Sequence, residues 1–417
     1  MLLRIFHKKS KYNMINSIDH FLSQSARSMK RSAVREILKL LHKPGMISFA
    51  GGLPAPETFP VNDLKEIALE VLEKEGEIAL QYGTTEGDPL LRKMLVERQN
   101  RQGLDIGIEN LIITTGSQQA IDLIARIFID PGDYVFCGLP SYLGGINAFI
   151  SYGAKLKGIP LDDHGMKPDE LEKAVITVKE SGRKIKFIYI IPDFQNPAGI
   201  TLPESRRLNI IEIAEKHDIL IVEDSPYREI RFEGKSQPLM YGLDKTGRVI
   251  TLSTFSKIFA PGFRVGWIIG NPVILDKIVI AKQTADICTS AFEQRIIARY
   301  LEKGLLEHNL PKTIALYRER RDMMLKCFRK YMPEKVSWTE PEGGLFLFVT
   351  MPSGINAASI LKKAIDNNVA FVDGSTFFCN DQGHNTMRIN FSYSSGKEIE
   401  AGVERLAKVI KNELKIN

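Results

Sequence analysis

Short β-branched and aromatic runs alternate with helical stretches from about residue 62 to residue 305, and this alternation constrains the fold more than any other feature. The strand-like runs are 111–114, 134–136, 187–190, 219–222 and 248–251, and helical spacing is clear at 120–129 and 203–217. Strands that alternate with helices usually join one mostly parallel sheet, because each helix crosses over a face of that sheet. The alternation therefore predicts an α/β domain whose sheet is covered by helices.

A different pattern follows this region. One long helix is expected at 305–331, and beyond it come a strand at 345–349, a helix from about 356, a strand at 387–391 and a terminal helix. This order is typical of a compact α+β unit, and 417 residues are too many for one compact core. We therefore expect an N-terminal arm with a mobile helix (1–60), a large domain (61–305) and a small C-terminal domain (306–417).

The composition is that of an ordinary globular protein, with 44% hydrophobic and 25% charged residues. The net charge of +6 is spread along the chain, which argues against a nucleic-acid partner. The four cysteines are far apart and predict reduced thiols and a cytoplasmic location. No His/Cys cluster favours a metal site, and no apolar run of about 20 residues favours a membrane span. The basic residues 1–13 are expected to be a disordered leader, or to precede a true start at Met14.

One stretch places a lysine among side chains that can bind phosphate. Thr254, Ser256, Lys257 and Arg264 lie close together, directly after an apolar run. A lysine at a strand end can lose its proton on desolvation and then form a Schiff base with a carbonyl compound. The two hydroxyls and the guanidinium could hold a dianionic phosphate. The ordinary alternative is a surface lysine on a polar loop.

Two further motifs follow strand-like runs. Ser117 lies in T-G-S-Q-Q at the start of an expected helix, where backbone N–H groups and the helix dipole favour a phosphate. Taken alone, the motif is more commonly an ordinary turn in which Ser117 caps the helix. Asn196 lies in P-D-F-Q-N-P-A-G, where it could donate a hydrogen bond to a phenolate oxygen. The alternative there is a loop stiffened by its prolines.

A carboxylate and an arginine complete the candidates. Asp224 comes directly after the strand-like run 219–222 in E-D-S-P-Y, at the end of a strand where open α/β sheets bind ligands, and Tyr227 follows it. Asp224 could instead cap a helix. Arg388 lies in the strand 387–391 and could clamp a carboxylate with its planar guanidinium, although a strand arginine is commonly a surface or ion-pair residue.

The order of these motifs resembles that of fold-type I pyridoxal-phosphate aminotransferases of class I and II. The lysine stretch is similar to S-x-S-K-x(6)-R, with Thr254 in place of the commoner serine. The signatures A-G-G-L-P-x-P at 50–56 and Q-Y-x-x-x-E-G at 81–87 resemble those of the 2-aminoadipate/kynurenine subgroup, and the resemblance runs from about residue 30 to the end of the chain. It implies a mostly parallel seven-stranded sheet in the large domain and pyridoxal 5'-phosphate as the cofactor.

By position, the resemblance gives roles to the cofactor-binding residues. Lys257 would form the Schiff base and move the proton, Asp224 would pair with the pyridine nitrogen, and Asn196 and Tyr227 would hold the phenolic oxygen. The remaining cofactor contacts would come from Ser117, Gln118, Thr254, Ser256 and Arg264 at the phosphate and from Tyr142 at the ring face.

The resemblance also implies substrate and subunit contacts. Gly52, Asn196 and Arg388 would bind the substrate carboxylate. Arg35 would select the side chain, although it could be an ordinary helix-surface charge. Tyr82 would reach the phosphate of the neighbouring subunit, so the expected active unit is a homodimer with shared sites.

The expected reaction is transamination of an L-amino acid of the 2-aminoadipate, aromatic or kynurenine, leucine or glutamate type, with 2-oxoglutarate as acceptor. A β-lyase or decarboxylase on the same fold would share every cofactor residue. A transcription regulator that carries this domain is the third interpretation. Only about 47 residues precede the motif at 49–52, and they show no basic recognition helix, so we expect no DNA-binding module.

Overall fold

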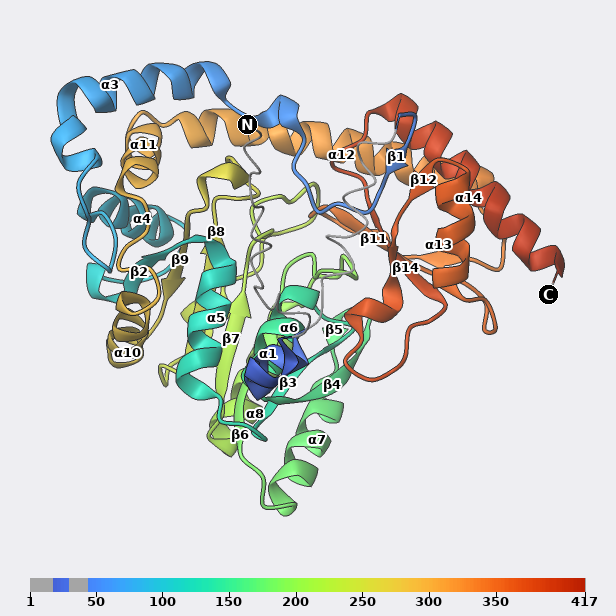
Figure 1. Cartoon of the computed structure of the whole chain (residues 1–417), viewed down its shortest axis with the longest axis horizontal. Coiled ribbons are helices and arrows are strands. Elements are labelled where there is room, and N and C mark those ends of the chain that lie inside the picture. The colour runs from blue at the N-terminus through green and yellow to red at the C-terminus, as the bar shows by residue number, and fades with distance from the viewer. Residues whose placement is uncertain (1–17, 30–43, 417) are drawn as a thin grey trace, which may run out of the picture.

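The core of the molecule is an eight-stranded sheet (Figure 1) with the order β2-β9-β8-β7-β6-β3-β4-β5. The computed structural model describes residues 18–29 and 44–416, so Arg35 and the basic residues 1–13 lie outside the described residues. The strands are β2 (Leu111–Thr114), β3 (Tyr134–Leu139), β4 (Lys155–Asp162), β5 (Gly165–Met166), β6 (Ile185–Ile190), β7 (Leu220–Asp224), β8 (Val249–Thr254) and β9 (Gly266–Ile269). The predicted α/β architecture is confirmed.

The resemblance implied seven strands, and the sheet contains one more. The chain turns back after β4, and the two residues of β5 pair with β4 in antiparallel orientation at the edge of the sheet. Strand β9 is antiparallel to both β2 and β8. The pairs from β4 through β3, β6 and β7 to β8 are all parallel. The carboxyl ends of β6, β7 and β8 therefore meet at one edge of the sheet.

Helices cover both faces of this sheet. Alternate residues of a strand point to opposite faces, so Tyr189 and Val222 join one apolar cluster and Ile190 and Ile221 join another. The first cluster contains residues of α5 (Gly116–Phe128) and α6 (Leu143–Ser151), and the second contains residues of α7 (Pro168–Glu180) and α8 (Glu204–His217). The other helices of this region are α3 (Val61–Ala79), α4 (Pro89–Arg101), α9 (Met240–Leu243), α10 (Pro272–Gln283) and α11 (Ala291–Glu302). Burial on both faces explains why the strands read as continuous apolar runs.

The second unit is built on a four-stranded antiparallel sheet with the order β10-β11-β14-β13. Its strands are β10 (Ser337–Trp338), β11 (Phe346–Thr350), β13 (Val372–Asp373) and β14 (Thr386–Asn390), and its helices are α13 (Ala357–Asp366) and α14 (Gly396–Ile416). The long helix α12 (Leu305–Tyr331) extends from beside α11 to α14 (Figure 1). The domain boundaries at 60 and 305 stay predictions.

An N-terminal segment also contributes to the second unit. Strand β1 (Ile47–Ser48) pairs in parallel with β12 (Val369–Ala370), and a short helix α1 (Gln24–Ser28) contacts α6. The residues directly after β1 therefore lie beside β14, because Phe49 O accepts a hydrogen bond from Asn390 N at 2.8 Å. This pairing brings the segment 50–52 to the edge where β6, β7 and β8 end.

Within residues 18–29 and 44–416, no helix has the length and apolar character needed to cross a membrane. The same residues contain no group of three or more His, Cys, Asp and Glu side chains that could hold a metal ion.

Candidate active site

The site begins with Lys257, three residues after β8. Its Nζ donates a hydrogen bond to Gly52 O at 2.7 Å, so the N-terminal segment contacts the lysine directly. Burial, together with the positive charges of Arg388 and Arg264, lowers the pKa of Lys257 to about 8. A larger fraction of this amine is therefore unprotonated at neutral pH than for an ordinary lysine, which suits a nucleophile.

Asp224 is the last residue of β7 and is only 2% exposed. Its Oδ2 accepts a hydrogen bond from the hydroxyl of Tyr189 at 2.6 Å. Its Oδ1 is buried and has no hydrogen-bond partner among the described residues. Burial raises the pKa of Asp224 to about 7, and the hydrogen bond from Tyr189 acts in the opposite direction. The unpartnered oxygen is a place for a cationic or N–H-bearing ligand group.

Arg388 lies in β14 and is 3% exposed. One guanidinium nitrogen donates to Asn196 Oδ1 at 3.0 Å and another donates to Ala50 O at 2.7 Å. Asn196 in turn donates to the Tyr227 hydroxyl at 3.3 Å. Arg388 makes no ion pair with any described carboxylate, and burial lowers its pKa to about 10. A buried guanidinium without a carboxylate can bind one from a substrate.

A second group of polar atoms gathers at the start of α5. Gly116 has a φ of +72°, and a Cβ built on it would lie 2.4 Å from Nη2 of Arg264. The left-handed φ favours glycine at this position, and the missing Cβ lets the guanidinium approach the backbone closely. Arg264 Nη1 donates to Ser256 Oγ at 3.3 Å, and Ser256 Oγ lies 2.9 Å from Thr254 Oγ1. Ser117 follows in the first turn of α5, so hydroxyls, a guanidinium and a helix N-terminus converge here.

Two more predicted cofactor residues lie together beside this group. The Tyr142 hydroxyl donates to Gln118 Oε1 at 3.3 Å, and Gln118 Nε2 donates to Gly144 O at 3.2 Å. Tyr82 is different, because 79% of its surface is exposed in the single chain. The structure thus brings every predicted cofactor and substrate residue except Tyr82 and Arg35 to one edge of the sheet, and Arg35 lies outside the described residues.

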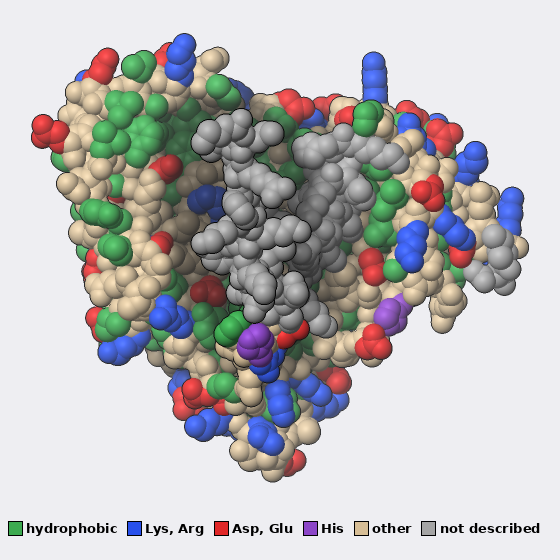
Figure 2. All heavy atoms as spheres, in the orientation of Figure 1, with side chains coloured by type: hydrophobic (Ala, Val, Ile, Leu, Met, Phe, Trp, Pro, Cys, Tyr) green, Lys and Arg blue, Asp and Glu red, His purple; other side chains and the backbone are tan. Residues whose placement is uncertain are grey.

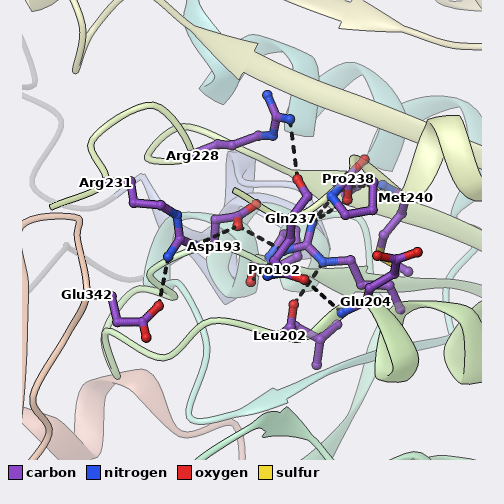
Figure 3. A network of polar contacts seen from close by, with 12 residues as sticks. Pro192, Asp193, Leu202, Glu204, Arg228, Arg231, Gln237, Pro238, Met240 and Glu342 are labelled. Carbon is purple, nitrogen blue, oxygen red and sulfur yellow. Dashed lines mark hydrogen bonds and ion pairs between the residues drawn. The ribbon is translucent and has the colours of Figure 1, made fainter. Parts of the chain in front are cut away.

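The loop that carries Asn196 is fixed by ionic contacts (Figure 3). Asp193 Oδ1 accepts a hydrogen bond from Arg207 at 2.8 Å and lies 3.8 Å from a guanidinium nitrogen of Arg231. Arg231 also pairs with Glu342 at 2.7 Å, on the segment that leads into β11. This network ties the Asn196 loop of the large sheet to the second unit.

The sequence did not reveal several residues that contact the site. The guanidinium of Arg388 lies over the rings of Phe346 and Phe377, at 4.2 and 5.0 Å from their centroids. Tyr189 contacts Asp224 from the neighbouring strand. A tyrosine within an apolar strand signals a buried hydroxyl that needs a partner, but the partner depends on strand register, which a single sequence does not contain.

Comparisons with known proteins agree with this geometry. The sequence profile of the family "Aminotransferase class I and II" matches residues 46–406. The aromatic-amino-acid aminotransferase 1 of Thermococcus litoralis is 47% identical, over 95% of this chain and 95% of that protein. The crystal structure of Pyrococcus horikoshii kynurenine aminotransferase, in complex with PMP, KYN and KYA, is similar with a TM-score of 0.93 and 45% identity, covering 96% of this chain and 99% of that one. The α-aminoadipate aminotransferase of Thermus thermophilus, complexed with N-(5'-phosphopyridoxyl)-L-leucine, is similar with a TM-score of 0.89 and 35% identity, covering 96% and 100% of the two chains.

The fold and the gathered lysine, carboxylate and arginines define an enzyme built to hold an anionic, ring-bearing cofactor. The chain belongs to the class I and II aminotransferases, and its cofactor is pyridoxal 5'-phosphate. The residues present fit this group in two respects. Asp224 offers a buried oxygen without a described partner, and the Arg264 guanidinium and the Ser256 hydroxyl lie at the N-terminus of α5, where an anion is stabilised.

Proposed function

We propose that this aminotransferase transfers the amino group of large L-amino acids to 2-oxoglutarate, with Lys257 as the residue that bonds to the cofactor. The donors we propose are aromatic amino acids and kynurenine, 2-aminoadipate, leucine and glutamate. The similar proteins are named for aromatic amino acids, kynurenine and α-aminoadipate, and one of them holds a leucine adduct, which supports this range. Pyridoxal 5'-phosphate supplies an aldehyde that links to amines and a ring that accepts electrons.

One observation carries the proposal. The segment 50–52 provides a carbonyl to each of two cations, because Ala50 O accepts from Arg388 and Gly52 O accepts from Lys257. A substrate carboxylate bound at Arg388 would therefore lie near the amine of Lys257. With its pKa lowered to about 8, this amine can take a proton from the substrate Cα and return it.

The other residues would orient the cofactor. Asp224 would accept a hydrogen bond from the protonated pyridine nitrogen at Oδ1. Asn196 and Tyr227, which already share a hydrogen bond, would contact the phenolic oxygen. The hydroxyls of Thr254 and Ser256, the Arg264 guanidinium and the N-terminus of α5 would bind the phosphate.

We also propose that the active unit is a homodimer. Tyr82 is exposed in the single chain, and so are Leu69, Leu72, Ile78 and Leu80 nearby in the sequence. Figure 2 shows hydrophobic side chains gathered at the upper left, where Figure 1 places α3. Sedimentation analysis of the Tyr82→Phe and wild-type proteins would measure the subunit number. The cytoplasmic location and the selector role of Arg35 stay predictions.

The test of the proposed function is Lys257→Ala. This variant should fold normally by circular dichroism and lose transamination by more than the roughly 10²–10⁴-fold that acid–base catalysis alone supplies, since the covalent link is lost as well. The assay measures product from a panel of donors with 2-oxoglutarate. Turnover close to that of the wild type would remove Lys257 from the mechanism.

A spectroscopic experiment separates transamination from lyase or decarboxylase chemistry. An aminotransferase converts its cofactor to the amine form with the first substrate and back with the second. The absorbance should therefore change on adding an amino acid alone and return on adding 2-oxoglutarate. If the absorbance did not return, and ammonia or carbon dioxide were released, a β-lyase or a decarboxylase would be favoured.

A further inference from the structure

Asp224 accepts a hydrogen bond from one side chain, that of Tyr189, which belongs to none of the sequence motifs. Tyr189 lies in β6, and the register pairs Tyr189 with Val222 of β7. Asp224 is two residues beyond Val222 and therefore on the same face of the sheet, diagonally opposite Tyr189. The hydroxyl of Tyr189 donates to Asp224 Oδ2 at 2.6 Å, and both residues are buried.

Helix α6 packs against the Tyr189 ring and fixes its position. Its ring lies edge-on to Phe149, with centroids 5.2 Å apart at an angle of 71°. A Cβ built on Gly145 would lie 3.1 Å from the same ring, so α6 approaches the tyrosine closely because this position is glycine. The hydroxyl therefore has little freedom to leave Asp224.

The proton between these two residues belongs to the tyrosine. Burial and the charge of Asp224 both raise the pKa of Tyr189 well above its usual value. Tyr189 therefore remains a donor over the whole working pH range, and Asp224 Oδ2 remains the acceptor. The second oxygen, Oδ1, is left as the acceptor without a partner in the described part of the chain.

We propose that Tyr189 is a positioning residue for Asp224, which fixes Oδ2 and presents Oδ1, as a carboxylate, to the cofactor. A buried carboxylate that loses its donor becomes a stronger base. Without the hydroxyl, Asp224 would draw the shared proton away from the pyridine nitrogen, and the ring would accept electrons less well. This inference rests on the proposed pairing of Asp224 with that nitrogen.

The experiment uses Tyr189→Phe, which keeps the ring and removes the hydroxyl. In the apoprotein, infrared difference spectra against Asp224→Asn identify the carboxyl band of Asp224, and its pH titration gives a midpoint. Loss of a hydrogen bond to a charged group should raise this midpoint by about one to two pH units. In protein reconstituted with cofactor labelled with ¹⁵N at the pyridine nitrogen, the resonance should move toward that of an unprotonated pyridine.

Tyr152→Phe is the matched control. The Tyr152 hydroxyl donates to Asp122 Oδ2 at 3.2 Å, which is the same type of pair at an exposed place beside α6. Its removal should leave the midpoint, the ¹⁵N resonance and kcat unchanged. An unchanged midpoint and resonance in Tyr189→Phe would overturn the inference. If Asp224→Asn also kept full activity, the proposed function of Asp224 would fail separately.

Discussion

Two groups of charged side chains meet at β7, where the adjacent carboxylates Glu223 and Asp224 point to opposite faces of the large sheet. The structural cluster contains Arg207, Arg231, Asp193 and Glu223, with two cations facing two carboxylates. The site cluster contains Lys257, Arg264, Arg388 and Asp224, with three cations and one carboxylate. Glu223 and Asp224 are adjacent in β7, so the alternation of strand side chains sends one carboxylate to each cluster.

The two adjacent carboxylates have different surroundings. Glu223 accepts hydrogen bonds from Met240 N, Tyr241 N and the Thr251 hydroxyl, and it lies 3.9 Å from Arg207. Asp224 accepts one, from Tyr189. A buried charge surrounded by protein donors stabilises a fold, whereas one with an unused oxygen is prepared for a ligand.

The net charge of each cluster supports the same distinction. Burial lowers the pKa values of Lys257 and Arg388 and raises that of Asp224, so each group is pushed toward its neutral form. Burial raises the pKa of Glu223 too, but there Arg207, the Thr251 hydroxyl and Met240 N act in the opposite direction. A phosphate, a carboxylate and a protonated pyridine would supply the opposite charges. A ligand would thus balance the charges of the site cluster, whereas the charges of the structural cluster balance one another.

The largest expected effect is on stability, in the structural cluster. Arg207 is 0% exposed, and Arg207→Met would leave Asp193 and Glu223 without their closest cation. We expect the free energy of unfolding of the apoprotein to fall by about 3–5 kcal/mol, as for other broken buried pairs. Urea unfolding of the wild-type and variant apoproteins measures this free energy. Lys216→Met is the control on the same helix, since its exposed pair with Glu172 contributes at most about 1 kcal/mol. Equal losses in both variants would erase the difference between the clusters.

The second prediction is that a substitution in the site cluster lowers activity more than it lowers the free energy of unfolding. Arg388→Gln removes a buried cation that has hydrogen bonds to Asn196 and Ala50 O but no ion-pair partner in the described residues, so the unfolding free energy of the apoprotein should fall by less than in Arg207→Met. The larger loss should be in activity. We expect kcat/KM to drop by the equivalent of about 2–5 kcal/mol for glutamate, 2-aminoadipate, leucine and phenylalanine alike, because all four donors share the α-carboxylate. A loss that depends on the donor side chain would contradict the assigned role.

The sequence indicated the charged residues that the structure brings together better than it indicated the side chains around them. The structure brings Lys257, Asp224 and Arg388 together; the first two follow strand-like runs in short motifs, whereas Arg388 was indicated by the resemblance to the family. The long helix at 305–331 was also predicted with its observed bounds, since its helical pattern is continuous. Local pattern was sufficient for this helix and for the two motifs at strand ends.

What was missed depends on contacts between distant segments. Tyr189 meets Asp224 through the register of β6 and β7, and Phe377 meets Arg388 through the packing of the second unit. Strand β9 was not predicted, because an antiparallel strand between β2 and β8 breaks the alternation from which the sheet was inferred. The two-residue strand β5 is too short to have a pattern. Register and packing are properties of the folded chain, and one sequence does not encode them in any local spacing.

The smallest expected effect is a pH dependence of the unfolding free energy that is caused by Asp224. The pKa of this carboxyl is about 7 in the folded apoprotein and about 3.9 in an unfolded chain, so the folded state binds more protons between these values. Stability must then fall as pH rises through this window. The titratable groups that face Asp224 are Tyr189 and Tyr227, whose pKa values are both raised, so they stay protonated there. Lys257, with a pKa of about 8, affects stability only at higher pH.

The unfolding free energies of the wild-type and Asp224→Asn apoproteins should therefore change by different amounts between pH 6 and pH 7. The two proteins differ only at residue 224, so the contributions of other groups largely cancel in the difference. The unfolding free energy of the wild-type apoprotein should fall by about 1 kcal/mol more than that of the variant over this unit. Urea unfolding of both apoproteins at the two pH values measures it. A difference of the opposite sign would mean that the fold stabilises the charged form of Asp224 without a ligand, as it does for an ordinary ion-paired carboxylate. The site cluster would then be balanced by the protein itself, and its contrast with the structural cluster would be lost.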